Sequence, residues 1–187
     1  METRYDLVNR RFGSALVCAA VLAAAVSSAA ALSKPVDPHV AFTAVGPAGL
    51  KIEGETAELD VAEQGDKIVV TVPLRNLHTG IALRDHHLKD KYLEVGQFPK
   101  SELTIERSAL KLPESGPVTA DLHGVLSLHG KSKPVTVHYE ATKSGTTTSV
   151  HGKFRINITD YGVSVPSYLG VTVKPDVDVE ASFRIGG

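Results

Sequence analysis

Long stretches of the chain alternate apolar and polar residues with a period of two. The clearest run lies between Pro117 and Gly130, where apolar residues or glycine occupy the even positions and polar residues most of the odd ones. Successive side chains of a β-strand point to opposite faces, so such a run predicts a strand with one buried face. Eight segments show or approximate the pattern: residues 40–44, 50–59, 68–74, 103–105, 118–128, 135–141, 150–158 and 177–185.

These segments predict an all-β fold, an eight-stranded antiparallel barrel. Short turns join neighbouring segments, and closure into a barrel removes the two unpaired edges that an open sheet would have. A barrel of this size either is filled by side chains or holds one small ligand. Small inward residues favour a cavity: Ala44, Ala120, Gly124, Ala141, Gly152 and Ala181. The alternative is an interior filled by aromatic side chains: Phe42, Tyr139, Phe154 and Phe183.

The segment from Leu83 to Pro99, LRDHHLKDKYLEVGQFP, departs from this alternation. Apolar residues recur there at helical spacing, and Gly96 provides a stop. We therefore expect a short helix near residues 81–95 that covers the barrel. Within it, Arg84 and Asp85 either contact a ligand or satisfy backbone groups and each other.

Residues 1–31 have the layout of a signal peptide. A basic start precedes an apolar run from Ala15 to Val26, and small residues follow up to Ala31. The run is shorter than the ~20 residues that a membrane-spanning helix needs, although a retained anchor is the alternative. We therefore expect a single barrel domain over residues 32–187, periplasmic or secreted, without a stable membrane anchor. The one cysteine, Cys18, lies in the leader, so the mature domain has no disulfide.

Charge and motif content argue against two classes of function. The 20 basic and 21 acidic residues are interspersed, so no basic stripe indicates a nucleic-acid partner. No nucleophile elbow is present, and Asp85 with His87 lacks an identifiable nucleophile beside it. We therefore predict that the protein is not an enzyme.

Three histidines raise the question of a metal. If Gly130-Lys131 and Ser144-Gly145 are two-residue turns, then His123, His138 and His151 form a cross-strand row on the barrel exterior. Three imidazoles can hold zinc or copper. A register slip of two residues would scatter the row, so these histidines are candidates and no metal is assigned.

Three sequence segments, taken in order, resemble a known family. They are RDHHL at Arg84–Leu88 followed by Phe98-Pro99, GVLSLHG at Gly124–Gly130 followed by Lys133-Pro134-Val135, and Asp160-Tyr161-Gly162. In this combination the chain resembles the YceI-like family of bacterial lipid- and polyisoprenoid-binding envelope proteins. The family usually has arginine where this chain has Thr159. The resemblance implies a lipocalin-like barrel whose apolar lumen holds a long isoprenoid or fatty chain, without catalytic residues or metal.

The first hypothesis for function is an exported carrier or sequestering protein for a polyisoprenoid, an isoprenoid quinone or a fatty-acid derivative. The alternatives are an envelope structural or partner-binding barrel with a filled core, and a metal-binding protein that uses the histidine row. No cofactor is expected other than a bound isoprenoid or lipid, and a homodimer is left open. The ligand-binding candidates form three sets. Those expected to cover the ligand are Leu83, Leu88, Tyr92 and Phe98; those expected to line the barrel are Leu126, Val137, Phe154 and Phe183; those expected at its polar end are Arg84, Asp85 and Tyr161.

Overall fold

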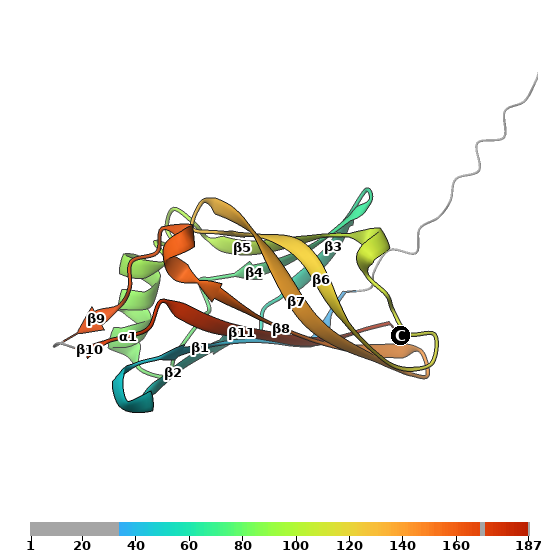
Figure 1. Ribbon diagram of the computed structural model, residues 1–187, viewed down its shortest axis with the longest axis horizontal. Helices are drawn as coiled ribbons and strands as arrows, with labels where there is room; N and C mark the ends of the chain where they lie inside the picture. The colour runs from blue at the N-terminus through green and yellow to red at the C-terminus, as the bar shows by residue number, and fades with distance from the viewer. Residues whose placement is uncertain (1–33, 169–170, 187) are drawn as a thin grey trace, which may run out of the picture. The chain divides into compact units, whose positions relative to one another are not determined.

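One antiparallel sheet of nine strands forms most of the structure, a computed structural model that describes residues 34–168 and 171–186 (Figure 1). The strand order is β2-β1-β11-β8-β7-β6-β5-β4-β3. The strands are β1 (Val36–Val45), β2 (Lys51–Thr56), β3 (Asp60–Gln64), β4 (Lys67–Pro73), β5 (Lys100–Glu106), β6 (Gly116–Leu128), β7 (Lys131–Ser144), β8 (Thr147–Asn157) and β11 (Asp176–Ile185). The signal peptide predicted for residues 1–31 lies outside the described residues.

The all-β class is confirmed, and the sheet curls into a half-barrel with one strand more than the eight predicted. The segment read as one strand over residues 50–59 ends at Thr56, and a further strand, β3, begins at Asp60. β2 and β3 lie at opposite edges of the sheet although only residues 57–59 separate them. The four Cα-to-Cα steps from Thr56 to Asp60 span about 14 Å at most, so the two edges approach each other at this link.

A continuous helical segment connects β4 to β5, as predicted for residues near 81–95. It begins as α1 (Ala82–His86) and continues as the wider π-helical turn η2 (His87–Tyr92). The amide of Leu93 donates to the carbonyl of Leu88 at 2.9 Å, the five-residue spacing of a π-helix. No helix among the described residues is long and apolar enough to cross a membrane.

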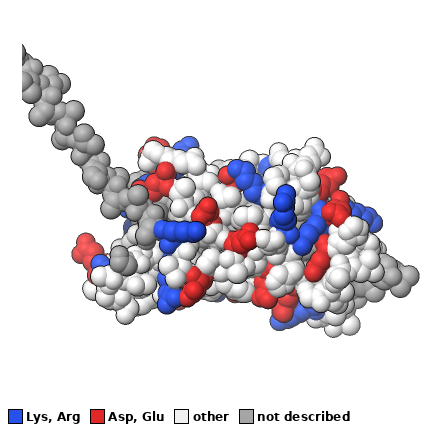
Figure 2. Space-filling model, turned by 180° about the vertical axis from the view of Figure 1, so that it is seen from behind, with Lys and Arg blue, Asp and Glu red and all other residues white. Residues whose placement is uncertain are grey.

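Smaller elements complete the described chain. A two-stranded ladder pairs β9 (Ser167–Tyr168) with β10 (Val171–Thr172). Short 3-10 turns occur at η1 (Pro47–Gly49), η3 (Arg107–Ala109) and η4 (Ile158–Tyr161). Figure 2 shows acidic and basic side chains intermixed on the face in view, as the interspersed charges of the sequence predicted.

Buried side chains inside the curled sheet form two clusters. One includes Leu126, Ile156 and Tyr161, and the other includes Ile68, Leu122 and Tyr139. The alternation predicted for the longest strand is confirmed, because Leu122, Leu126 and Leu128 are buried while Asp121 and His123 are exposed. The inner face of the sheet is therefore the core face, as in a barrel.

Candidate ligand-binding cavity

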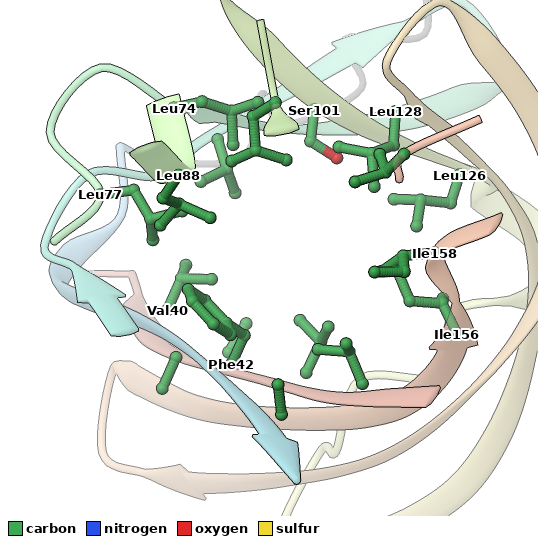
Figure 3. Close-up of a pocket in the computed structure, with 18 of the residues that line it drawn as sticks. Val40, Phe42, Leu74, Leu77, Leu88, Ser101, Leu126, Leu128, Ile156 and Ile158 are labelled. Atoms are coloured by element: carbon green, nitrogen blue, oxygen red, sulfur yellow. The ribbon is translucent and has the colours of Figure 1, made fainter. Parts of the chain in front are cut away.

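An apolar cavity of about 200 Å³ lies inside the curled sheet (Figure 3). Strands β1, β4, β5, β6, β8 and β11 and the helical segment contribute to its wall. Among the described residues that line it, only Tyr92 and Ser101 carry a polar side-chain atom, and the Ser101 hydroxyl donates to the Ser127 carbonyl at 3.2 Å. An ionised group placed inside would lack a charged partner, so the cavity suits a hydrocarbon chain.

The helical segment covers this cavity with one of its faces. Leu88, Tyr92 and Leu93 line the cavity, so the prediction for Leu88 and Tyr92 agrees with the geometry. Leu83 was also expected to cover the ligand, but its side chain is 59% exposed and does not line the cavity. Leu83 and Leu88 are five positions apart, which places them roughly 140° apart around an α-helix. The two leucines therefore cannot share one face.

Arg84 and Asp85 hold the start of this helix to Thr79 and do not line the cavity. The Thr79 amide and hydroxyl both donate to Asp85 Oδ1, at 2.6 and 2.5 Å. Arg84 donates from Nε to the Thr79 hydroxyl at 2.7 Å and from Nη2 to the Thr79 carbonyl at 2.6 Å. These bonds to backbone and neighbouring groups are the alternative considered from the sequence, and a contact of this pair with the polar end of a ligand stays a prediction.

The environment of Asp85 shifts its pKa. Partial desolvation raises the pKa, but the two hydrogen bonds from Thr79, together with Lys89 and His78, outweigh it and hold the pKa of Asp85 below its ordinary value. The ionised carboxylate is thus the form that the Thr79 contacts stabilise.

Phe98 and Tyr161 lie outside the cavity wall, although both were predicted to contact the ligand. The Phe98 ring packs on the His129 ring with centroids 4.5 Å apart. Tyr161 is 2% exposed within the first core cluster, and desolvation by burial raises the pKa of its hydroxyl. The Phe98 ring therefore packs at the β6–β7 turn, and the Tyr161 ring belongs to the core and does not line the cavity.

A second apolar cavity, of about 90 Å³, adjoins the first inside the curled sheet. Val137 and Phe183, predicted to line the barrel, border this smaller cavity. Leu126, predicted with them, borders the larger cavity, and Phe154 borders both. The four predicted barrel-lining residues thus all face cavity space, divided between two chambers.

The predicted histidine row does not form. The β6–β7 turn is centred on His129 and Gly130, one residue earlier than predicted, and both have positive φ, as a type I′ turn requires. Each one-residue turn shift moves the register by two, so His123 opposes Thr136 and His138 opposes Asp121. The β7–β8 turn is likewise displaced, and His151 opposes Glu140.

The three exposed histidines have separate partners. His123 Nδ1 lies 3.1 Å from Thr136 Oγ1, His138 Nδ1 lies 2.8 Å from Asp121 Oδ1, and His151 Nε2 lies 3.6 Å from Glu180 Oε2. Within residues 34–168 and 171–186, no three or more histidine, cysteine or acidic side chains are grouped to hold a metal ion.

Several cavity residues were missed because they lie outside alternating runs. Leu77 follows β4, while Val163, Pro166 and Val173 lie near η4 and the β9–β10 ladder. The spacing of Leu74 and Leu77, three residues apart before Gly80, is a weak signal that could have indicated a buried turn. Ser101 gave no signal, because a serine on a short strand is not distinctive.

A curled antiparallel sheet around an uncharged cavity, with a helical cover, defines a small lipocalin-like container. Residues 34–185 match the family model of the YceI-like domain, so the chain belongs to the YceI-like family. A UPF0312 protein of Pseudomonas savastanoi pv. phaseolicola is 30% identical over 135 residues, which cover 67% of each chain. A UPF0312 protein of Pseudomonas fluorescens is 32% identical over 123 residues, or 61% of each chain.

Two solved structures share the fold at low sequence identity. A polyisoprenoid binding domain from Saccharophagus degradans superposes with a TM-score of 0.68 at 15% identity, covering 83% of this chain and 99% of its own. BcnA from Burkholderia cenocepacia gives a TM-score of 0.61 at 15% identity, covering 79% of this chain and 95% of its own. These similarities show that the chain shares the fold of these two structures.

Proposed function

We propose that the protein is an exported carrier or sequestering protein that binds one long apolar chain. The proposed ligand class is a polyisoprenoid, an isoprenoid quinone or a fatty-acid derivative. The observation that carries the proposal is the cavity, whose described side chains are hydrocarbon except for the hydroxyls of Tyr92 and Ser101. The signal-peptide layout of residues 1–31 supports export, and the polyisoprenoid binding domain of Saccharophagus degradans supports the ligand class.

The size of the cavity is suited to part of an extended chain. At about 200 Å³ it exceeds the ~150 Å³ of an engineered apolar cavity that binds benzene, but not the ~300 Å³ at which typical ligand pockets begin. Each buried methylene contributes about 0.8 kcal/mol, so roughly five would contribute ~4 kcal/mol before the costs of ordering the chain. The segment of ligand inside is therefore held by hydrophobic burial alone.

The uncharged wall also limits the chemistry of the ligand. A carboxylate or phosphate inside would lose its hydration without gaining a cation, at a cost of several kcal/mol. An ionised head group therefore stays outside the cavity. We include in the proposal that the protein acts by binding and not by catalysis, since the cavity wall in the described chain presents no carboxylate, imidazole, amine or thiol.

The alternative of a barrel with a filled core made a different structural prediction. It required an interior without a void large enough for a chain, whereas the described core contains two apolar cavities. The cavities therefore favour the carrier over this alternative.

Native mass spectrometry of the protein purified from its own host tests the proposal. We expect an adduct with the mass of an apolar lipid. Leu126→Trp places an indole in the cavity wall and should abolish the adduct, because Leu126 is 5% exposed and lines the cavity. Val125→Trp, one residue away on the outer face and 45% exposed, should retain it. Only the bare polypeptide mass, in host-purified protein and after incubation with a lipid extract, would contradict the proposal.

A further inference from the structure

The space inside the sheet is divided into two chambers by a small set of side chains. The cavities of about 200 and 90 Å³ have four lining residues in common: Val70, Leu103, Phe154 and Ala181. The partition is also visible in the packing, because Leu103, Val135 and Phe154 contact both buried clusters. The wall between the chambers is therefore made by side chains and not by the backbone.

The strand register places these residues on opposite walls. Val70 pairs with Leu103 across β4 and β5. Phe154 and Ala181 belong to β8 and β11, and β7 and β6 separate those strands from β5 in the sheet order. In a sheet curled as in Figure 1, strands separated in this way face each other across the interior. Phe154 is the largest of the four shared side chains, so its ring supplies most of the partition.

The surroundings of Phe154 allow its ring to move. The side chain is only partly buried, because cavity space borders it on two sides. Gly152 precedes it on the same face of β8 and lines the smaller cavity, and a Cβ built on Gly152 would meet only Val137 Cγ1, at 3.3 Å. Loosely packed aromatic side chains forgo few contacts when they change rotamer.

We propose that Phe154 sets the length of apolar chain that the protein accepts, by closing the inner end of the larger cavity. This inference rests on the proposed function. A chain that enters the larger cavity meets the ring with its apolar tail, because the described lining of neither chamber includes a charged side chain that could pair with a head group. Longer chains gain further burial only by displacing the ring toward the smaller chamber, which Gly152 keeps open.

Binding of a prenyl alcohol series to the purified full chain tests the proposal. Geraniol, farnesol and geranylgeraniol differ in length and carry the same neutral head group. In the wild type, affinity should rise with length and then level off where the tail meets Phe154. Phe154→Ala joins the chambers, and we expect it to bind the longest alcohol about tenfold more tightly, the gain from burying roughly two more methylenes. Phe154→Trp should move the plateau to a shorter chain.

A second substitution separates the partition from general loosening of the core. Gly152→Leu fills the smaller chamber, so it should cancel the gain of Phe154→Ala in the double variant. Introduced alone, it removes the space into which the ring could move, so it should not shift the plateau to longer chains. Phe154→Leu is a milder truncation and should show a smaller gain in affinity for the longest alcohol. If circular dichroism shows that the alanine variant is unfolded, the leucine variant tests whether Phe154 limits the chain length.

The outcomes distinguish this inference from the proposed function. If the wild type binds the alcohols and both Phe154→Ala and Phe154→Leu show the same plateau as the wild type, the role of Phe154 is overturned. The proposed function is not affected by that result. A gain that persists in the Gly152→Leu double variant would also overturn the role of Phe154. If the wild type binds none of the three alcohols and carries no lipid by native mass spectrometry, the proposed function and this inference both fail.

Discussion

Small residues on the inner face of the sheet have two different roles. A Cβ added to Gly124 would lie 2.7 Å from Ile105 Cγ2 and 2.8 Å from the Thr104 carbonyl oxygen. Gly124 therefore permits close approach of β6 and β5 and leaves no empty space. Gly152, by contrast, borders the smaller cavity. The sequence argument that small inward residues favour a cavity is thus supported at Gly152 and not at Gly124.

This difference predicts unequal effects of alanine at the two glycines. Gly124→Ala should lower the free energy of unfolding by about 1–3 kcal/mol, because the methyl group must displace Ile105 or the β5 backbone. Gly152→Ala should change it by less than about 1 kcal/mol, since a single side-chain methyl needs to yield slightly. Urea unfolding of both variants measures the two values. Equal losses would show that Gly152 is as tightly enclosed as Gly124.

At the scale of the element, the helical segment presents two leucines to different surroundings. Leu88 lines the larger cavity, while Leu83 is exposed. Leu88→Ser should weaken binding of farnesol about tenfold, because the ligand loses an apolar contact surface worth roughly 1.5 kcal/mol. Leu83→Ser is the matched control and should leave the affinity unchanged. A loss of affinity in both variants would mean that the substitutions weaken binding by destabilising the helical segment, and not by removing a contact between its cavity-facing side and the ligand.

The elements differ in how far the sequence could predict them. Strands with regular alternation, such as β6 and β7, were predicted from the period of their apolar residues, because one face is more buried than the other over residues 118–128 of β6 and 135–141 of β7. The turn between them was misplaced because His129, a non-glycine residue, has a φ of 50°. Its ring packs on Phe98 and its Nε2 lies 2.7 Å from Glu94 Oε2, contacts from distant positions that a local sequence pattern does not contain.

For the cavity residues too, a local sequence pattern predicts some features, and contacts between distant residues decide the others. Leu126 and Phe154 were predicted from strand parity, which fixes the face but not the chamber that the side chain borders. The roles of Arg84 and Asp85 depended on Thr79, whose amide and hydroxyl are placed by the loop after β4. Whether a charged pair faces a ligand or its own backbone is decided by such tertiary placement and not by the motif.

At the scale of the whole molecule, the contacts of Thr79 connect the helical cover to an edge of the sheet. Beyond its bonds to Arg84 and Asp85, Thr79 adjoins β2, because a Cβ on Gly54 would lie 3.0 Å from Thr79 Cγ2. The backbone of the preceding residue, His78, pairs with Glu55 of β2 by hydrogen bonds of 2.8 and 2.9 Å. Asp85 therefore links the cover to the sheet edge that curls toward β3.

The lowered pKa of Asp85 predicts that this link depends on pH. A carboxyl whose pKa is lower in the folded than in the unfolded state stabilises the fold fully above its unfolded-state pKa. That contribution is lost as the pH falls through the lowered, folded-state pKa. Asp85→Asn removes the charge, and we expect it to lower the free energy of unfolding by about 1 kcal/mol at neutral pH, the difference between charged and neutral hydrogen bonds at a partly exposed site.

The pH profile distinguishes the charge of Asp85 from a general effect of substitution. The difference in unfolding free energy between wild type and Asp85→Asn should be constant at neutral pH and shrink toward zero in acid, as Asp85 itself becomes protonated. Asp90→Asn is the matched control on the same helix, because Asp90 contacts only the exposed His86, at 2.6 Å, among the described residues, and it should cost less than about 0.5 kcal/mol. A difference for Asp85→Asn that stays constant down to acidic pH would show that its carboxylate charge does not secure the cover.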